Sequence, residues 1–420
     1  MKADFILRNI GQLVTMAGSS RPRVGKEMNE VEILTDAYLA VKDGKVMATG
    51  TGEPGSNLVG EGTVIEDAAG LTVTPGLVDP HTHIVHGGSR EHEFAKKLAG
   101  VPYIDVLKQG GGILSTVRST KAATHEELYK KAKKSLDTML GYGMTTIEAK
   151  SGYGLDLETE IKQLEVAKSL NEDHPIDIAS TFLGAHAVPM EYKEDPDKFV
   201  DMVIEMLPIV KERELAEFCD VFCEEGVFSV PQTRKILLAA KELGYNLKIH
   251  ADEIVSLGGA ELAAEVGAIS GDHLMAASDN GIELMAREGV VADILPGTSF
   301  NLGKAYAPAR KMIDMGVPVA LSTDYNPGSC PTENIQFVMQ LGSLGLKMTP
   351  KEVFTSVTVN AAHSINRAHK VGTLEVGKDA DFVLFNAPNI DYIIYHFAIN
   401  HTKEVYKGGK LVFSNGRVCY

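Results

Sequence analysis

The stretch GMTTIEAKSG, residues 143–152, contains a short run of β-branched and apolar residues that ends at a lysine. Similar runs recur along the chain, and the segments between them, such as PDKFVDMVIEMLPIVKERELAE, carry apolar residues at helical spacing. The runs are Leu77–His83, Met144–Lys150, Ile176–His186, Cys219–Glu225, Leu247–Glu253, Ala268–Leu274, Val290–Pro296 and Val317–Asp324. Strands that alternate with helices are parallel, and eight such units predict an α/β protein with a closed (β/α)8 TIM barrel.

Both ends of the chain have a different pattern. Segments such as ADFILRNIGQLVTM near the N-terminus and KEVYKGGKLVFSNGRV near the C-terminus are short strands, with hairpin signals at Asp43-Gly44, Gly408-Gly409 and Asn415-Gly416. We expect residues 1–70 and 370–420 to join into one small β-sandwich-like domain. The barrel then occupies residues 71–369.

The charge balance restricts the partners. Lys plus Arg number 41 against 56 Asp plus Glu, a formal charge of −15, and such a field repels the phosphates of nucleic acids and anionic membranes. The N-terminal segment lacks the apolar core of a signal peptide, and the chain has no run of about 18 apolar residues. We therefore expect a cytoplasmic protein that binds neither nucleic acid nor membrane and that needs a local cation for any acidic substrate.

Polar side chains gather at the carboxyl ends of the predicted strands, where TIM barrels carry their active sites. His81 and His83 are two residues apart, so on a strand both rings face the same side. Two imidazoles in an apolar strand are costly unless something binds them. They could be two hydrogen-bonded surface histidines, but His250 and Asp324 at other strand ends favour a metal site. Three neutral imidazoles and a carboxylate suit zinc or iron and leave a position open for water.

These residues also carry a family resemblance. PGLVDPHTH, KIHADE, SGDHLM and LSTDYNPG resemble the metal-binding motifs of the amidohydrolase superfamily. HGGSREHEF, GGGILSTVRSTKAAT, EAKSGYGLDLETE, FLGAHAVPMEY, HADEI and STDYNPGSCPTEN resemble the motifs of the imidazolonepropionase family within it. The resemblance covers essentially the whole chain, and the set of loop motifs is more specific than the paired histidines alone.

The resemblance implies hydrolysis of the ring amide of 4-imidazolone-5-propanoate to N-formimidoyl-L-glutamate in histidine degradation, with one Zn²⁺ or Fe³⁺ per subunit. Such a metal lowers the pKa of water towards about 7. The implied metal ligands are His81, His83, His250 and Asp324. The implied catalytic residues are Glu253 and Asp324 for proton transfer and His273 for the oxyanion. The implied substrate contacts are Arg90, Tyr153, His186, Glu253, Asn326, Gly328 and Ser329, with Arg90 on the propionate.

Lys150 bears on the number of metal ions. Binuclear relatives use a carboxylated lysine, usually on the fourth strand, whereas Lys150 ends the second predicted strand. One metal is therefore favoured. Because a dimer is common among relatives, we expect a homodimer.

Two other functions compete with this interpretation. A deaminase of a free base, such as cytosine or guanine, would use the same metal centre, but Arg90 favours a substrate with an anionic tail. An inactive scaffold should have lost a ligand, yet the complete set is present.

Overall fold

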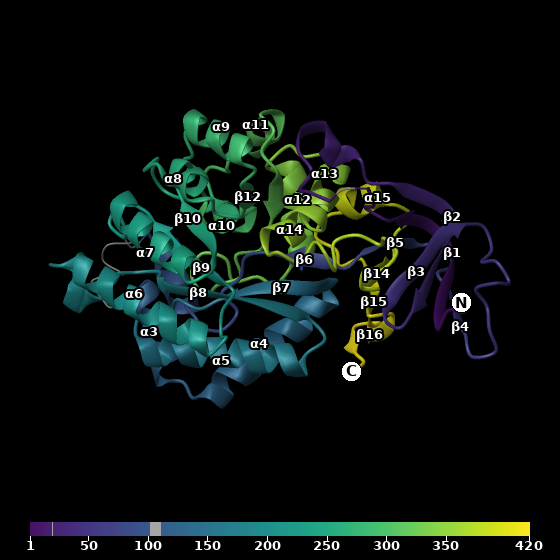
Figure 1. Ribbon diagram of the computed structural model, residues 1–420, viewed down its shortest axis with the longest axis horizontal. Helices are drawn as coiled ribbons and strands as arrows, with labels where there is room; N and C mark the ends of the chain where they lie inside the picture. The colour runs from purple at the N-terminus through teal and green to yellow at the C-terminus, as the bar shows by residue number, and fades with distance from the viewer. Residues whose placement is uncertain (19, 101–110) are drawn as a thin grey trace.

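The computed structural model describes residues 1–18, 20–100 and 111–420. Its centre is an eight-stranded sheet in which every neighbouring pair is parallel, in the order β6 to β13 (Figure 1). The strands are β6 Leu77–Asp79, β7 Met144–Lys150, β8 Asp177–Ala185, β9 Phe218–Cys223, β10 Asn246–Ala251, β11 Ser270–His273, β12 Val291–Ile294 and β13 Val319–Leu321. The predicted barrel is confirmed, and each strand overlaps one of the predicted runs, although β9 and β10 each begin one residue before theirs.

The barrel closes between its first and last strands just beyond their ends. Thr82 and Tyr325 form a parallel bridge, and the amide of His83 donates to the carbonyl of Tyr325 at 2.9 Å. Below the bridge, the carboxylate of Asp79 accepts from the amide and the hydroxyl of Thr323 at 3.1 and 2.6 Å. This side chain ties β6 to the chain after β13.

The first strand is shorter than expected from the sequence. The run Leu77–His83 was predicted to be one strand, but β6 ends at Asp79. Pro80 follows and has no amide hydrogen to continue a ladder. The two histidines therefore lie in the extended segment beyond the strand.

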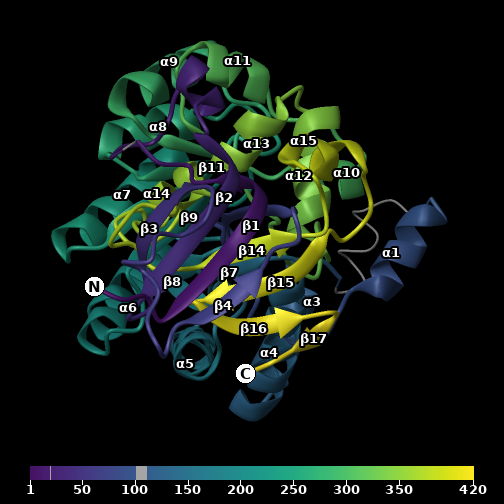
Figure 2. The ribbon, with the colours of Figure 1, turned by 90° about the vertical axis from the view of Figure 1, so that its right-hand side faces the viewer.

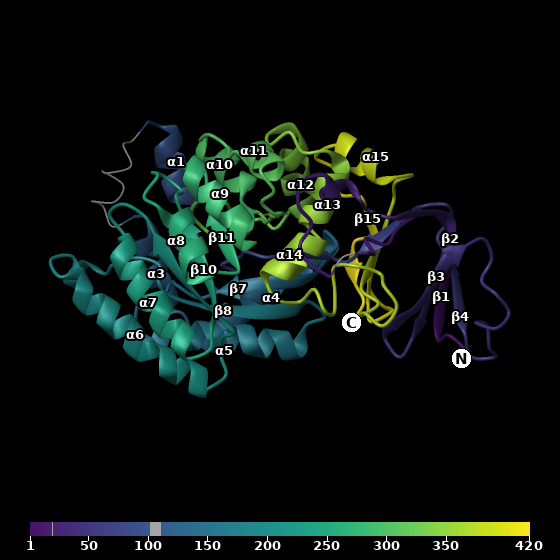
Figure 3. The ribbon, with the colours of Figure 1, turned by 45° about the horizontal axis from the view of Figure 1, so that its top comes forward.

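Helices surround the barrel on its outer side (Figure 3). They are α1 Glu91–Leu98, α3 Ile113–Ala122, α4 His125–Gly141, α5 Leu157–Asp173, α6 Pro196–Glu212, α7 Val230–Glu242, α8 Gly259–Val266, α9 Asp279–Glu288, α10 Pro296–Leu302, α11 Ala309–Asp314, α12 Ile335–Leu344, α13 Pro350–Ser356, α14 Val359–Ser364 and α15 Ile390–Tyr395, with 3-10 turns at Gly25–Asn29 and Met190–Tyr192. Among the described residues, none of these helices has the length and apolar character to cross a membrane.

Both chain ends form a second sheet of nine strands beside the barrel (Figure 2). Its strands are β1 Phe5–Val14, β2 Ile33–Lys42, β3 Lys45–Thr51, β4 Val64–Asp67, β5 Thr72–Pro75, β14 Phe382–Phe385, β15 Thr402–Lys407, β16 Lys410–Ser414 and β17 Arg417–Val418. The N-terminal and C-terminal strands meet where β5 pairs with both β1 and β14. The rings of Phe5 and Phe382, which are not on neighbouring strands, lie 6.3 Å apart between centroids. The predicted union of the termini is confirmed.

The chain passes from this sheet into the barrel at Gly76. A Cβ at this position would lie 2.1 Å from the hydroxyl of Thr145 on β7, so only glycine fits so close to the neighbouring strand. The domain division at residues 71 and 369 stays a prediction.

Candidate active site

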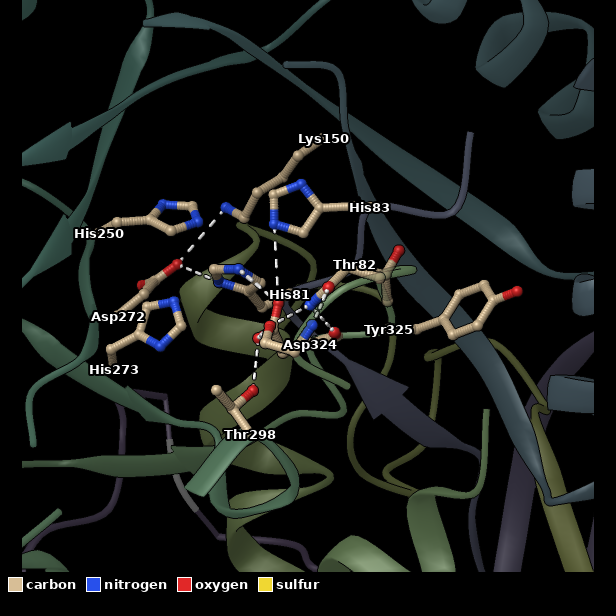
Figure 4. Close-up of polar contacts among 12 residues, drawn as sticks. His81, Thr82, His83, Lys150, His250, Asp272, His273, Thr298, Asp324 and Tyr325 are labelled. Atoms are coloured by element: carbon tan, nitrogen blue, oxygen red, sulfur yellow. Dashed lines mark hydrogen bonds and ion pairs between the residues drawn. The ribbon is translucent and has the colours of Figure 1, made fainter. Parts of the chain in front are cut away.

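Four histidine rings meet at the carboxyl end of the barrel (Figure 4). The ring centroid of His81 lies 4.6 Å from that of His250, 5.3 Å from that of His83 and 5.5 Å from that of His273. The segment after β6 provides the first pair, β10 provides His250 and β11 provides His273. One ring nitrogen from each of His81, His83 and His250 lies within 4.8 Å of the others. The tertiary structure therefore brings the three predicted histidine ligands together.

Asp324 completes the predicted ligand set. Its Oδ1 lies 3.6 Å from Nε2 of His81 and 3.7 Å from Nε2 of His83. Its amide donates to the carbonyl of His81 at 3.1 Å, and its φ of 53° lies in the left-handed region. Thr298 on α10 donates its hydroxyl to Oδ2 at 2.5 Å. One carboxylate oxygen thus faces the imidazoles while the other is held by a helix.

Two buried carboxylates orient the imidazoles from the outside. Nδ1 of His81 lies 2.6 Å from Oδ2 of Asp272, and Nδ1 of His250 lies 2.9 Å from Oδ2 of Asp220. Each Nε2 then points to the centre, where it is buried and has no hydrogen-bond partner among the described residues. A metal ion needs donors of this kind, with a carboxylate on the opposite ring nitrogen. The residues therefore fit the metal that the sequence predicts.

No role was predicted for Asp220 or Asp272 from the sequence. Asp220 lies within β9, and only 1% of its surface is exposed. An acidic residue inside an apolar run, CDVFC, was the available signal. The partner of Asp220, however, is His250, which is 30 residues away and on the next strand.

Lys150 lies below the imidazoles at the end of β7, the second barrel strand as predicted. Its ammonium contacts Glu148 at 2.9 Å, Asp220 at 2.8 Å and Asp272 at 3.4 Å. Burial alone would lower the pKa of this amine, but the three carboxylates outweigh it and raise the pKa above its usual value. A protonated amine is not the nucleophile that carboxylation requires. The number of metal ions stays a prediction.

Glu253 and His273 lie together beside the ligand set. Nε2 of His273 lies 3.7 Å from Oε2 of Glu253. Burial raises the pKa of Glu253 to about 7 and lowers the pKa of His273 to about 4. The glutamate can exchange a proton near neutral pH, and the histidine is a neutral ring that can donate one hydrogen bond.

One wall of the site is aromatic. The ring of His186 stacks on that of His83 at 4.9 Å and 9°, and the ring of Tyr153 lies 5.2 Å from His186. Nδ1 of His186 donates to the carbonyl of Gly152 at 3.0 Å, which leaves Nε2 for another partner. Tyr153 and His186, two of the predicted substrate contacts, are thus adjacent.

Arg90 lies against the other predicted contacts. Its Nη1 lies where a Cβ on Gly328 would be only 2.2 Å away. Asn326 accepts from the amides of Gly328 and Ser329, both at 2.8 Å, and so shapes this loop. The Arg90 side chain is 16% exposed and pairs with Glu93 at 2.9 Å, which differs from a freely solvated cation.

Comparisons with known proteins agree with this geometry. Residues 72–419 match the model of the Amidohydrolase family, which defines the class of protein. The barrel and terminal sheet superpose on an adenosine deaminase from Xanthomonas campestris with bound zinc (TM-score 0.73, 16% identity, covering 100% of this chain and 94% of that one). They also superpose on E. coli guanine deaminase (TM-score 0.73, 16% identity, 98% and 99%). At this identity the likeness concerns the fold.

Curated relatives are much more similar in sequence. Imidazolonepropionases from Alkaliphilus metalliredigens and Alkaliphilus oremlandii are 63% and 60% identical, each over the full length of both chains. One from Streptococcus pyogenes is 54% identical, again over both full lengths. The chain therefore belongs to the amidohydrolase family and, within it, to the imidazolonepropionases.

Proposed function

We propose that this enzyme hydrolyses the ring amide of 4-imidazolone-5-propanoate to N-formimidoyl-L-glutamate. The observation that carries the proposal is the convergence of His81, His83, His250 and Asp324. Family membership supports the choice of substrate. A bound Zn²⁺ or Fe³⁺ would supply Lewis acidity and a lower pKa for water.

The reaction needs a base, an oxyanion donor and a proton for the leaving group. The oxygen of water bonds to the ring carbonyl carbon, the bond from that carbon to the ring nitrogen breaks, and a water proton goes to this nitrogen. Glu253 suits the base because its pKa, raised to about 7 by burial, allows it to take and return a proton near neutral pH. His273 would donate a hydrogen bond to the carbonyl oxygen as negative charge develops there.

The substrate carboxylate needs a cation in a protein of charge −15. The Nη1 group of Arg90 faces Gly328, while Nε and Nη2 are paired with Glu93. We assign the propionate to this guanidinium, since arginine forms charge-assisted hydrogen bonds with carboxylates. Tyr153 and His186 would line the flat ring, and the Asn326–Ser329 loop would close around the tail.

The test is turnover of imidazolonepropanoate generated in place by urocanase, with the product identified by mass. Arg90→Ala should raise KM by about 10- to 100-fold and lower kcat less, because it removes a charge-assisted contact of about 1.5–3 kcal/mol. The control is Arg234→Ala, which removes a surface arginine that is paired with Glu265 on α8. Wild-type enzyme that leaves the substrate untouched but releases ammonia from cytosine or guanine would instead be a free-base deaminase.

We propose one metal ion per subunit, zinc or iron. Imidazole nitrogen binds both, so the donor set does not separate them. Elemental analysis of protein purified from zinc-supplemented and iron-supplemented cultures, with activity per metal, identifies the ion. A ratio of two ions per chain in active enzyme would contradict the single site.

We also propose that the enzyme is a homodimer, acts in the cytoplasm and binds neither nucleic acid nor membrane. Large apolar side chains are exposed on α10, α12 and α15, among them Phe300 at 56%, Leu344 at 59% and Tyr395 at 81%. Exposed apolar surface of this kind favours association. Light scattering should give a mass twice that of the 45.2 kDa chain, and Tyr395→Lys should shift the measured mass towards that of a single chain. Cell fractionation tests the location.

A further inference from the structure

A layer of buried charge lies inside the barrel below the imidazoles. It contains two lysines and four acidic residues, each no more than 1% exposed. These are Glu148, Lys150, Asp220, Lys248, Asp272 and Asp293. The proposed reaction uses none of them directly. Buried charge is costly unless it is paired, so the arrangement of these pairs needs a reason.

The Lys150 ammonium contacts both of the carboxylates that contact ligand histidines. Its ammonium donates to Oδ2 of Asp220 at 2.8 Å and lies 3.4 Å from Oδ2 of Asp272. The same Asp220 oxygen lies 2.9 Å from Nδ1 of His250, and the same Asp272 oxygen lies 2.6 Å from Nδ1 of His81. Figure 4 shows the ammonium and the His81 ring reaching one Asp272 carboxylate.

We propose that Lys150 is a positioning residue for the metal centre: one ammonium holds the two carboxylates that fix the rings of His81 and His250. The inference rests on the proposed function, because it assigns a role relative to the proposed metal.

The physical reason is electrostatic and geometric. Ligand-capable atoms of Asp220, His250 and Asp272 lie within 4.8 Å of one another, an arrangement that could hold a cation. The Lys150 ammonium is the cation next to both carboxylates, and it offsets the repulsion between them. With both held in place, Asp272 is hydrogen-bonded to Nδ1 of His81 and Asp220 holds Nδ1 of His250 by a contact of 2.9 Å, which leaves each Nε2 free for the metal.

Lys248 provides a matched comparison within the same layer. Its ammonium donates to the carbonyl of Pro80 at 3.0 Å and to Asp293 at 3.2 Å. It is 3.9 Å from Asp272, beyond hydrogen-bond distance. Lys248 is equally buried, yet it donates to neither carboxylate that contacts a ligand histidine. Lys248→Met therefore removes a buried cation that is paired with Asp272 but leaves the contacts of Lys150 with Asp220 and Asp272 in place.

The test compares zinc affinity in Lys150→Met and Lys248→Met. Metal-free proteins are titrated with Zn²⁺ against a chromophoric chelator, and the same proteins are loaded with Co²⁺ for visible spectra. We expect zinc affinity to fall 10–100-fold in Lys150→Met, the range for loss of an outer partner, and by a smaller factor in Lys248→Met. The cobalt d–d bands should change in Lys150→Met only.

A second variant keeps the test decisive if Lys150→Met does not fold, as judged by circular dichroism. Asp220→Asn preserves shape but removes the charge between Lys150 and His250, and it should lower zinc affinity to a similar extent. In a double variant the two losses should not add, since both act through one chain of contacts.

The outcomes separate this inference from the metal site itself. No zinc uptake by the wild type would overturn the metal centre and the inference with it. The inference alone would be overturned if the wild type binds zinc tightly and Lys150→Met, Lys248→Met and Asp220→Asn all bind it with the affinity of the wild type.

Discussion

The hydroxyl of Thr298 donates to Oδ2 of Asp324 at 2.5 Å, which leaves Oδ1 of the same carboxylate facing His81 and His83. Ser329 also reaches Oδ2, at 3.3 Å. An oxygen that already accepts two hydrogen bonds is a poor base. Glu253, whose carboxylate accepts no hydrogen bond among the described contacts, is therefore better placed to take the proton from water.

Thr298→Val should release Oδ2 of Asp324 and weaken the proposed ligand. We expect zinc affinity or kcat to fall about 10-fold, in line with the loss of an outer hydrogen bond. Thr298→Ser keeps the hydroxyl and should retain most of both. Metal content and kcat measured on the three proteins check this expectation, and wild-type values in Thr298→Val would contradict it.

Gly328→Ala should disturb Arg90 without disturbing the fold. The new methyl group would lie 2.2 Å from Nη1, the mobile end of the guanidinium, so the arginine must move. We expect KM to rise about 10-fold or more, with a smaller change in kcat and little change in Tm. Gly62→Ala serves as the control, because no atom lies within 4 Å of its added Cβ. An unchanged KM would remove Arg90 from the substrate site.

Glu160 should support the loop that carries Tyr153. Its buried carboxylate accepts from the amides of Gly152 at 2.9 Å, Gly154 at 2.7 Å and Leu155 at 2.9 Å. Glu160→Gln replaces one acceptor oxygen by a donor that faces amides. We expect a loss of about 1–3 kcal/mol in the free energy of unfolding and a higher KM.

The exposed Glu158 on the same helix gives the matched control. Glu158→Gln should leave both quantities near wild type. Urea denaturation and steady-state kinetics distinguish the two variants, and equal stabilities would show that the loop does not depend on Glu160.

Acid should destabilise the fold through His174. Burial lowers the pKa of His174 to about 4, against about 6.5 in the unfolded chain, so the unfolded state binds more protons between these values. Stability is therefore complete above pH about 6.5 and falls as pH decreases to about 4. At about 1.4 kcal/mol per pKa unit, this residue accounts for about 3 kcal/mol.

His174→Asn should flatten that pH dependence, whereas substitution of the exposed His369 should not. Urea unfolding at pH 7, 6, 5 and 4 provides the measurement. A slope in His174→Asn as steep as that of the wild type would assign the acid sensitivity to other groups.

Much of the fold was predictable because its signals are local. The alternation of apolar runs with helical segments located every barrel strand, and paired glycines and Asn-Gly marked terminal hairpins. The error at the first strand had a local cause, since Pro80 ends the ladder before the histidines. The gathering of His81, His250 and Asp324 at the carboxyl end of the barrel also followed from the pattern, because parallel strands present their carboxyl ends at one face.

The supporting contacts of the site were not predictable in the same way. Asp272 lies 191 positions from His81, and Asp220 meets His250 only because β9 and β10 are neighbours in register. Glu93 was missed as the partner of Arg90, although the two are three positions apart, because many exposed arginines have such neighbours.

The primary structure alone predicted the barrel, the proposed metal donors and the family, since these depend on periodicity and residue type. Only the closed barrel decided which ring nitrogen of each histidine faces the centre, which oxygen of Asp324 is free and which cation balances Asp220 and Asp272. Those choices depend on distances of about 3 Å between side chains of different strands, and such distances exist only after strand register and barrel closure bring the strands together.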